Sequence, residues 1–393
     1  MTPPESGNFL QGIPISVDPA LIDRALSRLW KPSEPREHAL ENDQAGTPSV
    51  TRACLSNLIL YLPDTIARIR AFGLVPLVGR RFPSRMFLLT HGKEREGGEA
   101  PLSAWITAVC HLTFPGAPPI CCEQIALEAA GGGERSLELF RGAVMSLLLP
   151  DVPVILCLLS PEGESLAAHL EPLVDRVILD STNVPLSRLE FLRSLLHRER
   201  LTCDDLAWRR TASWRRILCD IFDEALARPI LDGLRAIRVE FAGDRAALGS
   251  GTSGAAQAAL VAGWLASRLG WKPAPATAAG EASRPEVAGA FDRDGQRLRV
   301  LLSPREGDAP PGEILKVHLA AAESPEGAYL SIEASEDLQS FQVNYSTEAA
   351  CVLPRTILRQ SETEADLLGE ALERVTHQGV LRGAVDLAAS LGD

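Results

Sequence analysis

The sequence predicts an α/β protein of two domains, each a mixed β-sheet flanked by helices. The chain has 393 residues, which is more than one hydrophobic core usually covers. Apolar residues make up 46% of the chain and charged residues 23%, an ordinary globular balance. Short apolar runs typical of strands alternate with amphipathic stretches typical of helices, and this alternation indicates layered α/β structure.

The N-terminal 48 residues predict an arm, one helix and a linker. Asp18 followed by Pro19 is an N-cap with proline at the first helical position, so we expect a helix that ends at Trp30. Residues 31–48 are polar and contain prolines, which is typical of an exposed linker. No basic leader or long apolar run occurs, so we expect no signal peptide, no membrane partner and a cytoplasmic location.

The first α/β domain is expected over 49–200. A turn signal at 114–119, between two apolar runs, predicts a hairpin. Gly73 and Pro76 should end or kink the helix that contains them. The predicted strands are 51–62, 84–91, 103–113, 120–129, 152–159 and 174–179, and the predicted helices are 64–78, 134–148 and 185–198.

A tryptophan/arginine helical connection is expected over 201–272, followed by a C-terminal α/β domain over 273–393. The helix at 254–269 is apolar nearly all round, so it should be buried. The other predicted elements are helices 204–227 and 363–391, the latter broken near Gly379 or Gly383, and strands 234–241, 288–292, 296–302, 315–321, 329–333 and 341–344. Because elements follow a similar order in 51–150 and 234–390, one hypothesis is two copies of one unit.

Residues 206–225 contain the densest basic and aromatic cluster of the chain. From Trp214 onward the apolar residues recur at helical spacing, so Trp214 can belong to a core. The alternative is a contact with a partner or another domain, since tryptophan and arginine are enriched where proteins bind each other. The candidate partner-binding residues are Trp208, Arg209, Arg210, Arg215 and Arg216.

Charge argues against nucleic acid as the partner of this cluster. Arginines interleaved with tryptophans can bind single-stranded nucleic acid. The chain, however, carries a formal net charge of −12, whereas nucleic-acid binders usually show a basic domain. We therefore expect neither nucleic acid nor an anionic membrane as partner.

The sequence at 249–254, GSGTSG, matches G-x-G-x-x-G before a helix. Gly249, Gly251 and Gly254 could present backbone N–H groups to a phosphate there. The loop does not directly follow its strand, and no acidic ribose partner follows, so a surface connection is favoured. P-loop, G-x-S-x-G, H-E-x-x-H and EF-hand patterns do not occur. We therefore expect no enzyme activity and no cofactor.

The eight cysteines are expected to be free, buried thiols. No C-x-x-C occurs, and the seven histidines are scattered. A metal site needs convergent ligands, so none is expected.

Four stretches together carry a resemblance to a known family. They are FPSRMFLL at 82–89, LLLPDVPVILCLL at 147–159 with DRVILDS at 175–181, LAWRRTASWRR at 206–216, and AALVAGWLASRLGW at 258–271. In this order they resemble the glucose-6-phosphate dehydrogenase assembly protein family, OpcA. The matches cover about 50 to 271, and none is a catalytic signature.

The resemblance implies a regulatory function without catalysis. Members of the family bind glucose-6-phosphate dehydrogenase and promote its active oligomer, which supports the oxidative pentose phosphate pathway and NADPH supply. The implied mechanism is allosteric: the chain would bind the active assembly better than the inactive one. The alternative left open is a nucleotide- or sugar-phosphate-binding regulatory enzyme that uses the loop at 249–254.

Overall fold

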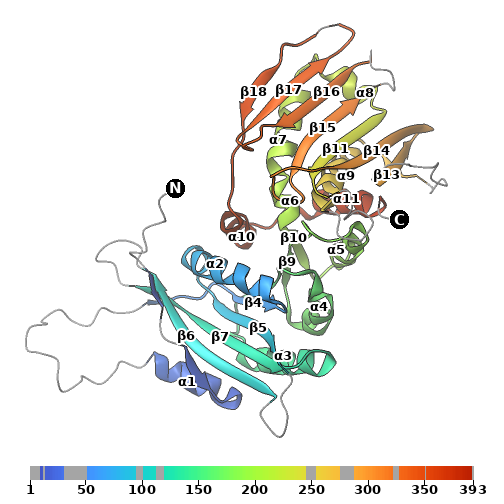
Figure 1. Cartoon of the computed structure of the whole chain (residues 1–393). Helices are drawn as coiled ribbons and strands as arrows, with labels where there is room; N and C mark the ends of the chain where they lie inside the picture. The colour runs from blue at the N-terminus through green and yellow to red at the C-terminus, as the bar shows by residue number, and fades with distance from the viewer. Residues whose placement is uncertain are drawn as a thin grey trace, which may run out of the picture. The chain divides into compact units, whose positions relative to one another are not determined.

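The chain divides into two compact units (Figure 1). The computed structural model describes residues 9–11, 14–30, 51–93, 101–111, 119–244, 254–274, 287–321, 327–349 and 351–391. The first unit comprises Met1–Leu179 with Leu368–Glu373, and the second comprises Asp180–Leu367 with Arg374–Asp393. The division between the units follows Leu179, and residues 201–272 belong to the second unit.

The sheet of the first unit is parallel at its centre. β4 (Asn57–Leu62) pairs in parallel with β5 (Arg85–Gly92) and β8 (Val154–Leu158), and β5 pairs in parallel with β7 (Ile120–Ala130). β4 and β8 are buried at every position, as expected for strands covered on both faces. The order is β1-β6-β7-β5-β4-β8-β9, with β2 on β6 and β3 on β7. The other strands are β1 (Phe9–Gln11), β2 (Ile15–Val17), β3 (Thr51–Arg52), β6 (Leu102–His111) and β9 (Arg176–Leu179).

Helix α2 (Thr65–Arg81) corrects one prediction about this unit. It continues through Gly73 and Pro76 instead of ending early. Proline removes only the hydrogen bond to the carbonyl four residues before it. That carbonyl belongs to Phe72, whose side chain is exposed, so water can reach this side of the helix. The other helices are α1 (Ile22–Leu29), α3 (Glu134–Leu147) and α4 (Glu164–Leu170), with short η1 (Pro19–Leu21), η2 (Pro161–Gly163) and η3 (Glu171–Leu173).

The sheet of the second unit is mostly antiparallel. β11 (Ala236–Ala242) pairs in parallel with β14 (Gln296–Arg305) and antiparallel with β15 (Ile314–Ala320). Burial alternates along its strands, which is typical of a sheet with one packed and one solvated face. The order is β12-β13-β14-β11-β15-β16-β17-β18. The remaining strands are β12 (Lys272–Pro273), β13 (Val287–Arg293), β16 (Tyr329–Ala334), β17 (Ser340–Ser346) and β18 (Arg355–Leu358).

The prediction of two mixed sheets flanked by helices is confirmed, but the two-copy hypothesis is wrong. The strands at the centre of the first sheet pair in parallel. In the strand order given above for the second sheet, only β11 and β14 are parallel neighbours. Strand orders also differ. The apparent repetition came from the order of elements along the chain, which does not determine how strands pair.

Close helix packing explains one glycine of the second unit. The predicted burial of the apolar helix is confirmed in α9 (Ala256–Arg268), which packs against α11 (Gln378–Ala389). A Cβ at Gly263 would lie 2.4 Å from the Ala384 carbonyl oxygen, so only glycine permits this approach. The other helices are α5 (Leu189–Leu196), α6 (Leu206–Arg210), α7 (Ala212–Phe222), α8 (Arg228–Asp232), the short η4 (Leu186–Arg188), and α10 (Glu364–Glu373), which is divided between the two units.

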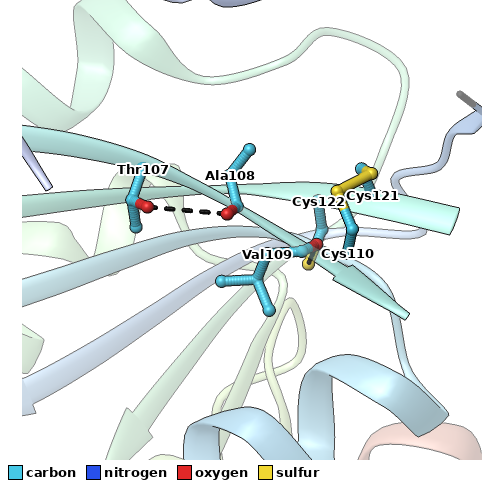
Figure 2. Close-up of a disulfide and its surroundings, with 6 residues drawn as sticks. All are labelled: Thr107, Ala108, Val109, Cys110, Cys121 and Cys122. Carbon is cyan, nitrogen blue, oxygen red and sulfur yellow. Dashed lines mark hydrogen bonds between the residues drawn. A yellow bond between two sulfur atoms is a disulfide. The ribbon is translucent and has the colours of Figure 1, made fainter. Parts of the chain in front are cut away.

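A disulfide joins Cys110 and Cys121 (Figure 2). The two residues lie opposite each other on the antiparallel strands β6 and β7, with their Cα atoms 4.0 Å apart. The expectation of free thiols is therefore wrong for this pair, because strand register brings together residues that the sequence separates by a loop. The cysteines that remain free are Cys54, Cys122, Cys157, Cys203, Cys219 and Cys351, of which Cys219 and Cys351 are exposed.

We predict that Cys110→Ser lowers the melting temperature. The bridge spans a sequence separation of 11, and the loss of unfolded-state entropy for such a loop is worth up to about 3 kcal/mol. The pairing of β6 with β7 already constrains the two ends of this loop, so we expect the substitution to lower the free energy of unfolding by about 1–3 kcal/mol. Thermal unfolding with and without a thiol reductant measures this, with Cys351→Ser as the control. A wild-type melting temperature that does not respond to reductant would contradict the prediction.

Candidate functional site

The tryptophan/arginine segment folds as a strand and two short helices. β10 (Thr202–Asp205) leads into α6, and the Asp205 carboxylate accepts a hydrogen bond from the Ala207 N–H at 3.2 Å as the N-cap. α6 and α7 separate at Thr211, whose hydroxyl donates to the Trp208 carbonyl at 2.7 Å. The single helix expected over 204–227 is therefore interrupted, because the threonine hydroxyl bonds the backbone locally.

Arg209 belongs to a buried ion pair inside the second unit. Its guanidinium donates to both carboxylate oxygens of Asp204, at 3.1 and 2.6 Å. It also donates to the Arg374 carbonyl at 2.7 Å, and the Thr376 hydroxyl donates to Asp204 at 2.9 Å. Asp204 is fully buried. A buried charge is tolerated when it is paired and hydrogen-bonded, so this network stabilises the fold.

The same network explains where the last helical region breaks. The predicted break lies just before Gly379 and not at Gly383, since α10 ends at Glu373 and α11 begins at Gln378 and continues through both glycines. The intervening Arg374 and Thr376 are the groups that bind Arg209 and Asp204. A long-range polar network, rather than a local glycine, therefore sets the break.

Arg210 is also paired with an acidic residue. It donates to Asp180 at 2.8 Å and to the Thr182 hydroxyl at 2.6 Å. Thr182 in turn donates to Asp180 at 2.6 Å. The Glu364 carboxylate lies 4.0 Å from the same guanidinium. Arg210 thus keeps its charge compensated within its own unit.

Both tryptophans of the segment are buried. Trp208 is 3% exposed and Trp214 1%. The Trp214 ring meets Phe341 edge-on at 4.7 Å between centroids, which confirms the core interpretation for Trp214. Trp208 and Arg209 do not offer their side chains to solvent, and the hypothesis that they take part in partner binding stays a prediction. The sequence does not reveal the distant residues that cover them.

Arg215 differs from its neighbours because it has no ion pair among the described residues. Its guanidinium carbon lies 3.3 Å from the centroid of the Trp208 ring. Nη2 donates to the Trp208 carbonyl at 3.2 Å, while the buried Nε has no hydrogen-bond partner. Desolvation by burial lowers the pKa of Arg215. Arg216 is exposed and donates to Gln360 at 3.3 Å. Of the five candidates, Arg216 is exposed, Arg210 and Arg215 are half-buried, and Trp208 and Arg209 are buried.

Burial raises the pKa of Asp205 to about 7, and the negative charge of Asp180 adds to the effect. Hydrogen bonds from the Ser181 hydroxyl at 2.7 Å and the Ser181 N–H at 2.9 Å oppose it. Ionisation of Asp205 therefore costs more in the folded chain than in the unfolded one.

We predict that Asp205→Asn makes stability less dependent on pH. The pKa of Asp205 rises from 3.8 to about 7 on folding, so its stabilising contribution is complete below about pH 4 and declines as the pH rises to about 7. Asparagine keeps the acceptor but cannot ionise. The unfolding free energy in urea, compared between about pH 5 and about pH 7.5, should fall less in the variant. An equal decrease of the unfolding free energy in both proteins between the two pH values would contradict the prediction.

The glycine loop gains no support as a phosphate site. Gly249 and Gly251 lie outside the described residues. Gly254 has a φ of +59°, and a Cβ there would lie 3.1 Å from the backbone nitrogen of Gly312. Close packing and a left-handed backbone thus account for Gly254. The favoured surface connection stays a prediction, and phosphate binding by this loop stays the alternative hypothesis.

Both ring nitrogens of His91 have hydrogen-bond partners within the first unit. Nδ1 lies 2.9 Å from the Gly131 carbonyl and Nε2 lies 2.8 Å from the Tyr61 hydroxyl. Within the described residues no cluster of three or more His, Cys, Asp or Glu side chains could hold a metal ion. None of the described helices is long and apolar enough to cross a membrane.

Comparison with protein families decides the affiliation. Residues 77–194 match the glucose-6-phosphate dehydrogenase subunit N-terminal domain, and residues 202–385 match the corresponding C-terminal domain. Both belong to OpcA, and together they cover more than half of the chain. The chain belongs to the OpcA family.

Curated relatives of the OpcA family are similar over part of their length. The putative OxPP cycle protein OpcA of Synechococcus elongatus is 33% identical over 181 residues, which is 45% of this chain and 38% of that protein. The protein of the same name from Nostoc punctiforme is 30% identical over 242 residues, 60% of this chain and 43% of that protein. The chain thus spans about two fifths of the length of the curated relatives it matches.

Solved structures show only distant similarity. The WlbA dehydrogenase of Thermus thermophilus, with NAD and UDP-GlcNAcA, has a TM-score of 0.41 and 14% identity, covering 86% of this chain and 95% of that one. The apo scyllo-inositol dehydrogenase of Lactobacillus casei has a TM-score of 0.41 and 12% identity, covering 86% and 97%. Similarity at this level carries no information on activity.

Proposed function

We propose that the chain is a non-catalytic assembly factor that binds glucose-6-phosphate dehydrogenase and promotes its active oligomer. Such a role would support the oxidative pentose phosphate pathway and NADPH supply. The observation that carries the proposal is the match of both halves of the chain to domains described as glucose-6-phosphate dehydrogenase subunit. The names of the cyanobacterial relatives, which refer to the oxidative pentose phosphate cycle, support the same pathway.

The mechanism we propose is a population shift. A protein that binds two states of an enzyme equally cannot change their ratio, whereas one that prefers the active oligomer can. A difference in affinity of about 2–3 kcal/mol changes the ratio of the two states by about 30- to 150-fold. The chain then needs a binding surface and a rigid scaffold, and no catalytic group.

The tryptophan/arginine segment supplies a candidate for that surface. Arg215 is held flat against Trp208 and has a partly buried charge without a carboxylate among the described residues. A carboxylate of the enzyme would form charge-assisted hydrogen bonds with a guanidinium that is already oriented. In this arrangement Arg215 and Arg216 contact the partner, while Trp208, Arg209 and Arg210 act as positioning residues.

The direct test mixes the full chain with glucose-6-phosphate dehydrogenase of the same organism. Light scattering measures the mass of each protein and of the mixture, and NADPH production at low substrate measures activity as the chain is added. A larger co-eluting species with a raised rate would support the proposal. Separate elution with unchanged rates would overturn it.

We predict that Arg215→Ala weakens binding of the dehydrogenase by about 1–3 kcal/mol, the range for hydrogen bonds to charged groups. Because the unpaired cation is desolvated, its removal should leave the melting temperature unchanged or slightly higher. Arg215→Lys should also weaken binding, since an ammonium lacks the planar fork. Titration calorimetry measures the affinity.

Arg228→Ala is the matched control, because Arg228 is an exposed arginine on α8 of the same unit. The affinity of the Arg228→Ala variant for the dehydrogenase should equal that of the wild type. Equal affinities for Arg215→Ala and wild type, with both folded, would exclude Arg215 from the interface without affecting the proposed function.

A further inference from the structure

Helix α2 of the first unit is apolar on its outer side as well as its inner side. Ile66, Ile69 and Phe72 are 79%, 70% and 82% exposed, and Leu77 is 48% exposed. The residues that face the core are Ala67, Ala71, Leu74, Val75, Val78 and Gly79. The half-buried Arg68 and Arg70 of the same helix donate to the backbone carbonyls of His91 and Leu159. A run of large exposed apolar side chains marks an interaction surface.

Gly73 lies in the middle of this outer stripe. An added Cβ at Gly73 would find no atom within 4 Å, so nothing described within the chain requires glycine there. Glycine inside a helix costs about 1 kcal/mol relative to alanine. A small residue does, however, let a second helix approach closely. Gly73 therefore forms a notch next to the protruding Phe72.

Charges of opposite sign lie at the two ends of the stripe. At the N-terminal end, Asp64 is the N-cap of α2 and accepts a hydrogen bond from the Ser160 hydroxyl at 3.0 Å, which brings η2 with the exposed Glu162 next to it. At the C-terminal end, Arg80 is exposed and has no ion pair among the described residues, while Arg81 pairs with Glu373. The stripe is thus acidic at one end, apolar in the middle and basic at the other.

We infer that the chain forms a two-fold symmetric dimer in which α2 of one protomer packs antiparallel against α2 of a second copy. A two-fold axis requires a self-complementary surface, and the stripe has that property. With the axis beside Gly73, Phe72 of each protomer enters the notch of the other. Arg80 then lies near the acidic end, Asp64 and Glu162, of its partner. This inference concerns the chain alone and does not depend on the proposed function.

The test measures the mass of the full chain alone by sedimentation equilibrium over a wide concentration range. Wild type should reach twice the monomer mass. The double variant Ile69→Glu with Phe72→Glu should weaken dimerisation at least 100-fold, because both side chains are exposed in the monomer and buried in the dimer. Gly73→Leu should weaken it at least 10-fold by filling the notch while leaving the monomer folded. Met145→Glu, which changes an exposed apolar residue of α3, should have no effect.

A charge exchange tests the antiparallel arrangement. Arg80→Glu alone and Glu162→Arg alone should each weaken dimerisation several-fold, since like charges then face each other. The two changes together should restore it, because each charge meets its opposite across the axis. Failure of the pair to restore the wild-type constant would overturn the antiparallel arrangement.

Two results would overturn the dimer. The first is a wild-type chain that stays monomeric at all concentrations. In that case, a lower melting temperature for the Ile69→Glu, Phe72→Glu variant would mean that the stripe packs within the chain, and loss of binding to the dehydrogenase would make the enzyme its occupant. The second is a dimer that all the α2 variants leave unchanged.

Discussion

The buried ion pair between Asp204 and Arg209 is the interaction on which the tryptophan/arginine segment depends. It ties the start of α6 to the backbone at Arg374 and the hydroxyl of Thr376. The network binds the residues between α10 and α11, and Trp208, next to Arg209 on α6, is buried. Loss of one member of such a pair leaves an uncompensated buried charge, which typically costs about 3–5 kcal/mol. The most basic stretch of the chain is thus mainly structural.

Arg215 is the exception, and the contrast supports a partner-binding role. Arg209 and Arg210 each have a carboxylate, whereas Arg215 has an indole beneath it and a desolvated charge. If all three arginines were paired only within the fold, we would expect a third carboxylate next to Arg215. The ion pairs of Arg209 and Arg210 around Arg215 keep its position fixed, so a binding partner would not have to order the Arg215 side chain first.

Local signals in the sequence predicted local structure well. Asp18 caps its helix, and the residues spaced from Trp214 form a buried helix face, as their side-chain chemistry indicates. The errors arose where distant residues meet. Arg209 finds partners 165 and 167 residues away, and strand register places Cys110 opposite Cys121. Periodicity cannot reveal such pairs, and element order could not show that the two sheets differ. The family resemblance identified the affiliation, but not which arginines remain accessible.

The central claim is that one accessible face of the tryptophan/arginine segment binds glucose-6-phosphate dehydrogenase while its buried side holds the fold together. Hydrogen exchange on the full chain, with and without the dehydrogenase, tests this most directly. The account predicts slower exchange for amides of α7 around Arg215, with β10 and α6 already slow in the free chain. Unchanged exchange throughout α7, in a mixture where the two proteins bind, would contradict it.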